Sequence, residues 1–402
     1  MKHTLLDKII YLLGIFVMFS FCLTGTAGTF TSIVGVLLLF SFSLLQRVKF
    51  KFFFPCKMFV FLLCFALFCF LSNIWARDNK LSWEASTSIL RMWIVLELVF
   101  CSISRQQIPQ LFNMIIWGST LFIIYIISTV GINEIILLSH MEERLGGDNF
   151  NANMVGLLGS VLIVVCYSFF LYHGFSLKLL ASLLGFLIVF LTSSRKAFVV
   201  LFIGVFLVYV QKRKIDNIPL FLLKLILVVI VFCGIVYFLL STSAFSLYAE
   251  RFNELSAFIL DTEDITHSDW ERKVMIEAGL NQFYETPFTG IGIDNGKIIA
   301  ESLTGNSFYL HNNYVELLAD VGIFGFMSFY AIYLYFGVRM YKLHSYWNEY
   351  SKLAITLLVM FLIADYGRVS YYYKDVMFVL IVCYRVLEDT EKRALLTGKS
   401  IL

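Results

Sequence analysis

Long, uninterrupted runs of apolar residues dominate the chain, and most are close to the length that crosses a bilayer as a helix, about 20 residues. The runs are solid rather than alternating, which favours helices over the strands of a membrane barrel. The pattern predicts about twelve spanning helices, at residues 9–26, 29–46, 57–75, 86–103, 111–130, 154–172, 178–193, 196–211, 220–241, 313–338, 351–367 and 372–388.

The charges between these runs predict their orientation. With the N-terminus inside, most Lys and Arg residues of the short loops fall on the cytoplasmic side, as insertion favours. The first run is expected to remain as a span, because no small-residue cleavage site ends a short apolar region. An even number of spans places both termini in the cytoplasm. Two polar segments then lie outside, residues 131–153 and the longer residues 242–312.

Composition narrows the class of protein further. Hydrophobic residues make up 59% of the 402 residues and charged residues only 15%, which is more apolar surface than a soluble domain can bury. We therefore predict an all-α polytopic integral membrane protein with a single membrane domain, residues 1–402, whose large extracytoplasmic loop carries part of the active site. The basic residues form no continuous face, so no nucleic-acid partner is expected. No metal cluster or ATP-binding motif is apparent, so no cofactor is expected.

Polar side chains open the apolar run HNNYVELLADVG, residues 311–322. Asn312 or Asn313 can cap a helix there, and Glu316, three residues after Asn313, would complete a capping box. Capping accounts for the asparagines but not for His311. A lone histidine at a helix start is more often structural than catalytic. However, the positive end of a helix disfavours imidazolium, and a neutral imidazole is what a general base needs.

Two cations, Arg195 and Lys196, interrupt the apolar stretch LTSSRKAFVVLF, residues 191–202. One interpretation is a tight turn with two cations that reach the membrane surface. The other is a fixed cation that faces a buried anionic ligand, since charges at this depth are costly and usually have a partner. Arginine suits a phosphate because its planar fork donates two hydrogen bonds at once.

Three further segments of the outer face carry candidate residues. Arg272 lies near the start of a helical apolar pattern in the large loop, where pairing with a neighbouring glutamate is the favoured alternative. Arg144 precedes Asn151 and Asn153, which either cap the next helix or contact a hydroxylated ligand. Arg368 lies just before a run of three tyrosines, residues 371–373, and has the least weight. Tyrosines are common at membrane interfaces, and an aspartate three residues earlier offers a partner.

In this order, these residues resemble the superfamily of O-antigen ligases and O-antigen polymerases, over roughly residues 140–330. The matching elements are R-x-x-G and N-x-N-x-x-G within Arg144–Gly156, S-R-K-A at Ser194–Ala197, an Arg-led helix followed by P-x-x-G-x-G within Arg272–Gly292, and H-N-x-Y-x-E-L-x-x-x-x-G at His311–Gly322. The last element is the most specific, and S-R-K-A is weak by itself.

The resemblance implies a GT-C-like fold in the bacterial inner membrane and an inverting, metal-independent transfer of a glycan from undecaprenyl pyrophosphate. It implies that Arg195 and Arg272 hold the pyrophosphate and that His311 activates the acceptor hydroxyl. Membrane lipid and a separate chain-length regulator protein are the implied partners. The predicted substrate-binding residues are Arg144, Asn151, Asn153, Lys196, Asn312, Asn313 and Arg368.

The superfamily motifs leave the acceptor open. The forms HNNYVELLADVGIFGF and SSRKA resemble polysaccharide polymerases, which favours polymerisation of lipid-linked repeat units into O-antigen or capsular polysaccharide. The alternative is a ligase that moves a finished glycan to a lipid A core or a protein. A lipid-glycan flippase or another transporter is a third hypothesis. It predicts internal repeats and helices broken near the midplane, and the sequence analysis identifies neither.

Overall fold

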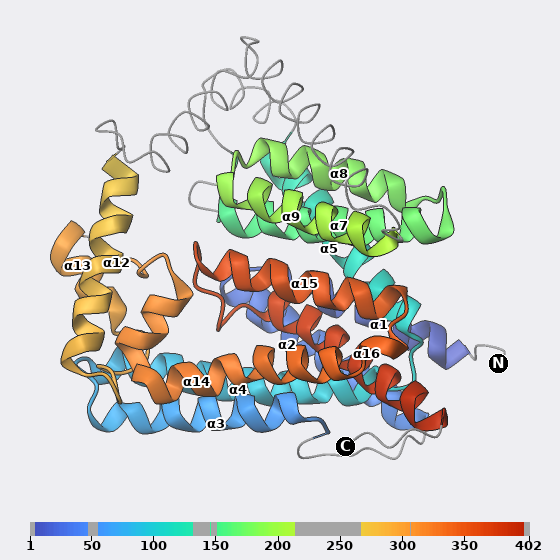
Figure 1. Cartoon of the computed structure of the whole chain (residues 1–402). Coiled ribbons are helices and arrows are strands. Elements are labelled where there is room, and N and C mark those ends of the chain that lie inside the picture. The colour runs from blue at the N-terminus through green and yellow to red at the C-terminus, as the bar shows by residue number, and fades with distance from the viewer. Residues whose placement is uncertain are drawn as a thin grey trace, which may run out of the picture. The chain divides into compact units, whose positions relative to one another are not determined.

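The computed structural model describes residues 5–46, 55–131, 145, 151–213, 267–305 and 307–397, and the elements that it defines there are helices (Figure 1). Each predicted span coincides with a helix, except that the span 220–241 lies outside the described residues. Seven of the described helices are long and apolar enough to cross a membrane. The chain is thus an all-α polytopic membrane protein, as predicted.

The chain divides into two compact units, and the first comprises Met1–Phe122 and Trp270–Leu402. Within it, α3 packs against α4 and α14, α15 packs against α14 and α16, and α16 contacts α1. The two ends of the sequence therefore contribute to one helical bundle. Its elements are α1 (Leu5–Cys22), α2 (Gly25–Leu45), α3 (Lys57–Leu71), η1 (Ser72–Ile74), α4 (Asn79–Ser102), most of α5 (Ile108–Val130), most of α12 (His267–Glu285), α13 (Gly296–Thr304), α14 (Asn313–Lys342), η3 (His344–Tyr346), α15 (Glu349–Asp365) and α16 (Lys374–Leu396).

The second unit, Ile123–Asp269, contains the end of α5 with α7 (Ala152–His173), α8 (Lys178–Leu191) and α9 (Arg195–Lys212). Small residues let α7 approach its two neighbours closely. A Cβ atom on Gly156 would lie 2.8 Å from the hydroxyl oxygen of Thr192, and one on Gly159 would lie 2.7 Å from a methyl carbon of Ile188. Close packing over small residues is typical of helices that associate within a membrane.

Helix α14 is interrupted at Gly322, whose φ of 59° and ψ of −168° lie outside the helical region. This combination is essentially restricted to glycine. The expectation of no broken helix is therefore wrong for α14. The sequence does not reveal the break, because single glycines are common in unbroken spanning helices.

The backbone of residues 287–292, which we call the docking loop, fills this break. The Ile323 N–H donates to the carbonyl of Pro287 at 2.8 Å. Before the break, the carbonyl of Asp320 accepts the N–H of Gly292 at 2.8 Å, and that of Ala319 accepts the N–H of Ile291 at 3.1 Å. A broken helix leaves backbone groups that need other partners, and here the loop supplies them.

Candidate active site

His311 has a left-handed backbone conformation, with φ of 58°. For a residue with a side chain this conformation costs roughly 1–2 kcal/mol. The half-buried imidazole lies against the ring of Tyr309, with the ring centroids 4.4 Å apart. The surrounding structure must therefore fix this residue, which is the behaviour expected of a functional position.

The contacts on each side of His311 fix its backbone. Asn312 caps α14, since its side-chain oxygen accepts the N–H groups two and three residues ahead at 3.0 and 3.2 Å. The capping box does not form, because the cap is Asn312 and Glu316 lies four residues after it. The Glu316 carboxylate instead accepts the N–H of Leu310 at 2.6 Å.

Asn313 is fully buried and joins α14 to the connection between α15 and α16, residues 366–373. Its amide nitrogen donates to the Tyr330 hydroxyl at 2.8 Å and to the Asp365 carboxylate at 3.3 Å. Its amide oxygen accepts the N–H of Ser370 at 2.9 Å. The α15–α16 connection is thereby bound to Asn313, which lies two residues after His311 in the sequence.

Arg368 lies in this connection and is only 4% exposed. Its guanidinium carbon is 4.8 Å from the centre of the Tyr373 ring. Its buried Nε has no hydrogen-bond partner in the described part of the chain. Asp365, the partner considered from the sequence, accepts from Tyr330 (2.9 Å) and Asn313, and no ion pair between it and Arg368 is present within 4 Å.

Helix α12 brings Arg272 into the same unit. Met275 and Gly279 follow Arg272 by three and seven residues, so the three residues lie on one face of the helix. A Cβ atom on Gly279 would lie 2.6 Å from a methyl carbon of Val315 and 2.8 Å from one of Leu310. This face therefore packs closely on Leu310, the residue before His311, and on Val315 in the first turn of α14. Arg272 lies about 10 Å farther along the axis of α12.

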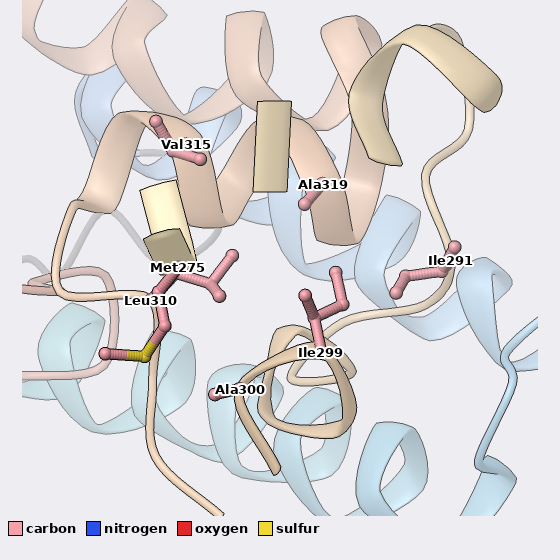
Figure 2. Close-up of a cluster of buried hydrophobic side chains, with 7 residues drawn as sticks. All are labelled: Met275, Ile291, Ile299, Ala300, Leu310, Val315 and Ala319. Atoms are coloured by element: carbon pink, nitrogen blue, oxygen red, sulfur yellow. The ribbon is translucent and has the colours of Figure 1, made fainter. Parts of the chain in front are cut away.

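A cluster of buried apolar side chains holds these elements together (Figure 2). Its members come from α12, α13, α14, the docking loop and the residue before His311: Met275, Ile291, Ile299, Ala300, Leu310, Val315 and Ala319. Leu310 is 0% exposed. Burying a leucine side chain stabilises a protein by about 1.5–3 kcal/mol, which is comparable with the cost of the left-handed conformation next to it.

Two buried polar side chains fix residues 294–296, which join the docking loop to α13. The Asp320 carboxylate accepts the N–H of Asp294 at 2.7 Å and that of Gly296 at 2.6 Å. Asn295 forms two bonds with the backbone of Asp78, accepting its N–H at 2.7 Å and donating to its carbonyl at 3.3 Å. Neither residue was a candidate from the sequence. An acidic side chain inside an apolar helix was the available signal for Asp320.

In the second unit, Arg195 is the first residue of α9. The hydroxyl of Ser194 accepts the N–H of the third residue of α9 at 3.4 Å and donates to the amide oxygen of Asn153 at 3.0 Å. Asn151 caps α7, because its side-chain oxygen accepts the N–H groups of Asn153 (3.0 Å) and Met154 (3.3 Å). Asn153 therefore ties the start of α7 to the residue before Arg195.

The two units divide the predicted site residues between them. The first carries His311, Arg272, Asn312, Asn313 and Arg368, and the second carries Arg195, Lys196, Asn151 and Asn153. Arg144 lies outside the described residues. The described residues include no group of three or more His, Cys, Asp or Glu side chains that could hold a metal ion.

Comparison with known proteins gives one family. No curated protein matches the chain. Residues 180–330 match the model of a family described as O-antigen ligase. The matched segment contains the starts of α9 and α14, helix α12 and the docking loop. This match supports the resemblance of the motifs to the superfamily of O-antigen polymerases and ligases, which spans much of the same part of the chain.

Proposed function

We propose that the protein polymerises undecaprenyl-pyrophosphate-linked oligosaccharide repeat units at the extracytoplasmic face of the cytoplasmic membrane, with both termini in the cytoplasm. The observation that carries this proposal is the strained backbone of His311, fixed by Asn312 and Glu316 within the segment that matches the family. A residue held in a sparsely populated conformation is characteristic of active sites.

In the proposed reaction, His311 takes the proton of the acceptor hydroxyl, and the hydroxyl oxygen attacks the anomeric carbon of the donor sugar. The bond from this carbon to the pyrophosphate oxygen breaks, and the lipid pyrophosphate leaves with the bonding electrons. Attack opposite the leaving group inverts the anomeric configuration. A positioned general base typically accelerates such a step by about 10²–10⁴-fold, because a sugar hydroxyl is a weak nucleophile.

Arginines take the role of charge stabilisation in this proposal. Arg272 and Arg195 bind the donor pyrophosphate, whose negative charge grows as the bond breaks. The capping contact of Ser194 and its bond to Asn153 fix the start of α9, which supports a fixed position for Arg195. No metal or other cofactor is part of the proposed mechanism. A separate chain-length regulator is the proposed protein partner.

The description of the matching family favours a second candidate, an O-antigen ligase. A ligase shares the donor chemistry and differs in the acceptor, which is a lipid A core or a protein. Deleting the gene in its host and separating the surface glycan on a gel distinguishes the two. Single repeat units on their normal anchor indicate a polymerase, and full-length polymer retained on undecaprenyl pyrophosphate indicates a ligase. Repeat units confined to the cytoplasmic leaflet indicate a flippase and refute the proposal.

Complementing the deletion with variants tests the assigned residues. His311→Ala and Arg195→Ala should insert normally and restore no polymer. The matched controls are His344→Ala and Arg91→Ala, which change exposed residues outside the proposed site and should restore full polymer. Normal polymer from a well-expressed His311→Ala protein would contradict the mechanism.

A further inference from the structure

Three tyrosines near His311 have no role in the reaction proposed above. The ring of Tyr309 lies against the imidazole, 4.4 Å away between centroids. The rings of Tyr372 and Tyr373 are 4.8 Å apart, and the guanidinium of Arg368 lies 4.8 Å from the centre of the second ring. One tyrosine thus contacts the candidate base, and the other two extend from the buried arginine.

These two groups of side chains lie close to each other. The hydrogen bond from Ser370 to Asn313 holds the segment that carries Arg368 beside the start of α14. The N–H of Tyr373 donates to the carbonyl of Ser370 at 3.0 Å, so Tyr373 lies within one turn of this anchor. We call Tyr309, Tyr372 and Tyr373 the tyrosine cluster.

The exposure of these side chains differs in an informative way. Tyr372 is 36% exposed, and Tyr309 and Tyr373 are half-buried, so parts of their rings are accessible. Arg368 is 4% exposed, and its Nε is buried without a hydrogen-bond partner in the described part of the chain. Buried polar groups normally have partners, so this donor is suited to a ligand group.

The chemistry of the cluster fits a saccharide. A pyranose ring has an apolar C–H face and a polar rim of hydroxyls, and a tyrosine likewise combines an apolar ring face with a hydroxyl at its edge. Ligand sites in general combine aromatic walls with a few convergent polar groups. Here Arg368 offers the charged donor, and His311 lies against the ring at the other side of the cluster.

We propose that the tyrosine cluster and Arg368 form a saccharide-binding subsite that seats a pyranose ring of the acceptor glycan against His311. The acceptor is assigned rather than the donor because Tyr309 contacts the residue that would deprotonate the acceptor hydroxyl. This inference rests on the proposed polymerase function, in which the acceptor is a second lipid-linked repeat unit.

A binding experiment without turnover tests the subsite. The probe is the free repeat-unit oligosaccharide, released by mild acid from the lipid-linked material of the deletion host, so that no pyrophosphate contributes to affinity. Binding to purified protein carrying His311→Ala is measured by titration calorimetry. Adding Tyr372→Ala should weaken binding about fivefold, the size expected for one aromatic stacking contact. Adding Tyr372→Phe should leave binding within about twofold, because the ring remains.

Two further variants make the result specific. Tyr366→Ala is the matched control, since it removes a 64% exposed tyrosine of the same connection that lies outside the cluster, and binding should be unchanged. Tyr372→Leu keeps apolar bulk without a flat ring and replaces the alanine variant if that protein does not elute as a single species. Equal affinity in all these proteins overturns the subsite. The proposed function fails separately, if the His311→Ala protein still polymerises.

Discussion

Replacing Gly322 with alanine is expected to destabilise the protein strongly. The φ of 59° and ψ of −168° are strained for any residue with a Cβ atom, at about 1–3 kcal/mol. The new Cβ atom would also lie 2.4 Å from the carbonyl carbon of Phe288, so the docking loop must move. That movement breaks the 2.8 Å bond between Ile323 and Pro287, and an unsatisfied buried group costs about 1–3 kcal/mol. Together these terms amount to about 4 kcal/mol, which should lower the apparent Tm by at least about 5 °C.

The assay is thermal unfolding of detergent-purified protein, followed by size-exclusion chromatography with fluorescence detection. Gly337→Ala is the matched control on the same helix, since its Cβ atom would lie 3.8 Å from Leu358, an ordinary contact. A helical glycine gains about 0.5–1 kcal/mol on replacement by alanine, so this control should be neutral or slightly stabilised. Gly290→Ala should lower the Tm as Gly322→Ala does, because a Cβ atom on this docking-loop residue would lie 2.3 Å from the backbone of Asp320 in α14. Equal Tm values for Gly322→Ala and Gly337→Ala would refute the reasoning.

Three other changes have defined outcomes. His311→Gly should give a higher Tm than His311→Ala by the equivalent of about 1 kcal/mol, because glycine adopts the left-handed conformation freely, while both variants make no polymer on the complementation gel. Asn313→Ala should lower the Tm by the equivalent of about 2 kcal/mol, because the buried Ser370 N–H loses its acceptor; an unchanged Tm would contradict that role. Burial raises the pKa of Asp294, although Lys297 at 2.7 Å lowers it. The folded state therefore disfavours the ionised carboxylate. The stability of the wild type relative to Asp294→Asn should fall as pH rises from about 4 through the raised pKa. Parallel Tm curves of the two proteins from about pH 4 to about pH 7 would contradict this prediction.

The spans were predictable because a bilayer requires long apolar runs whatever their neighbours are. The pair of helices on either side of Arg195 illustrates this, since three residues, Thr192–Ser194, separate α8 from α9 and both helices were located from hydropathy alone. The break at Gly322 was not predictable, because the partner that fills it lies some 30 residues away in sequence and contributes backbone atoms, which carry no residue signature.

The arrangement of the candidate site residues was predictable only in part, for a similar reason. Motif positions selected His311 and Arg272 as candidates, and both lie in the first unit, where the face of α12 that carries Arg272 packs on Leu310 and Val315. The tyrosine cluster required three-dimensional information, because the segments that carry it meet through the Asn313 amide. The capping box failed for a local reason, since the cap shifted by one residue to Asn312 and Glu316 found another donor.

The docking loop also has a mechanical consequence. Its backbone bonds to both halves of α14 across the break, while the face of α12 that carries Arg272 packs on Leu310 and Val315. Neither helix can slide along the other without leaving backbone groups unpaired or opening the apolar contact. Arg272 and His311 should therefore keep a constant separation during the proposed reaction, and this part of the first unit should act as a rigid frame for the two candidate side chains.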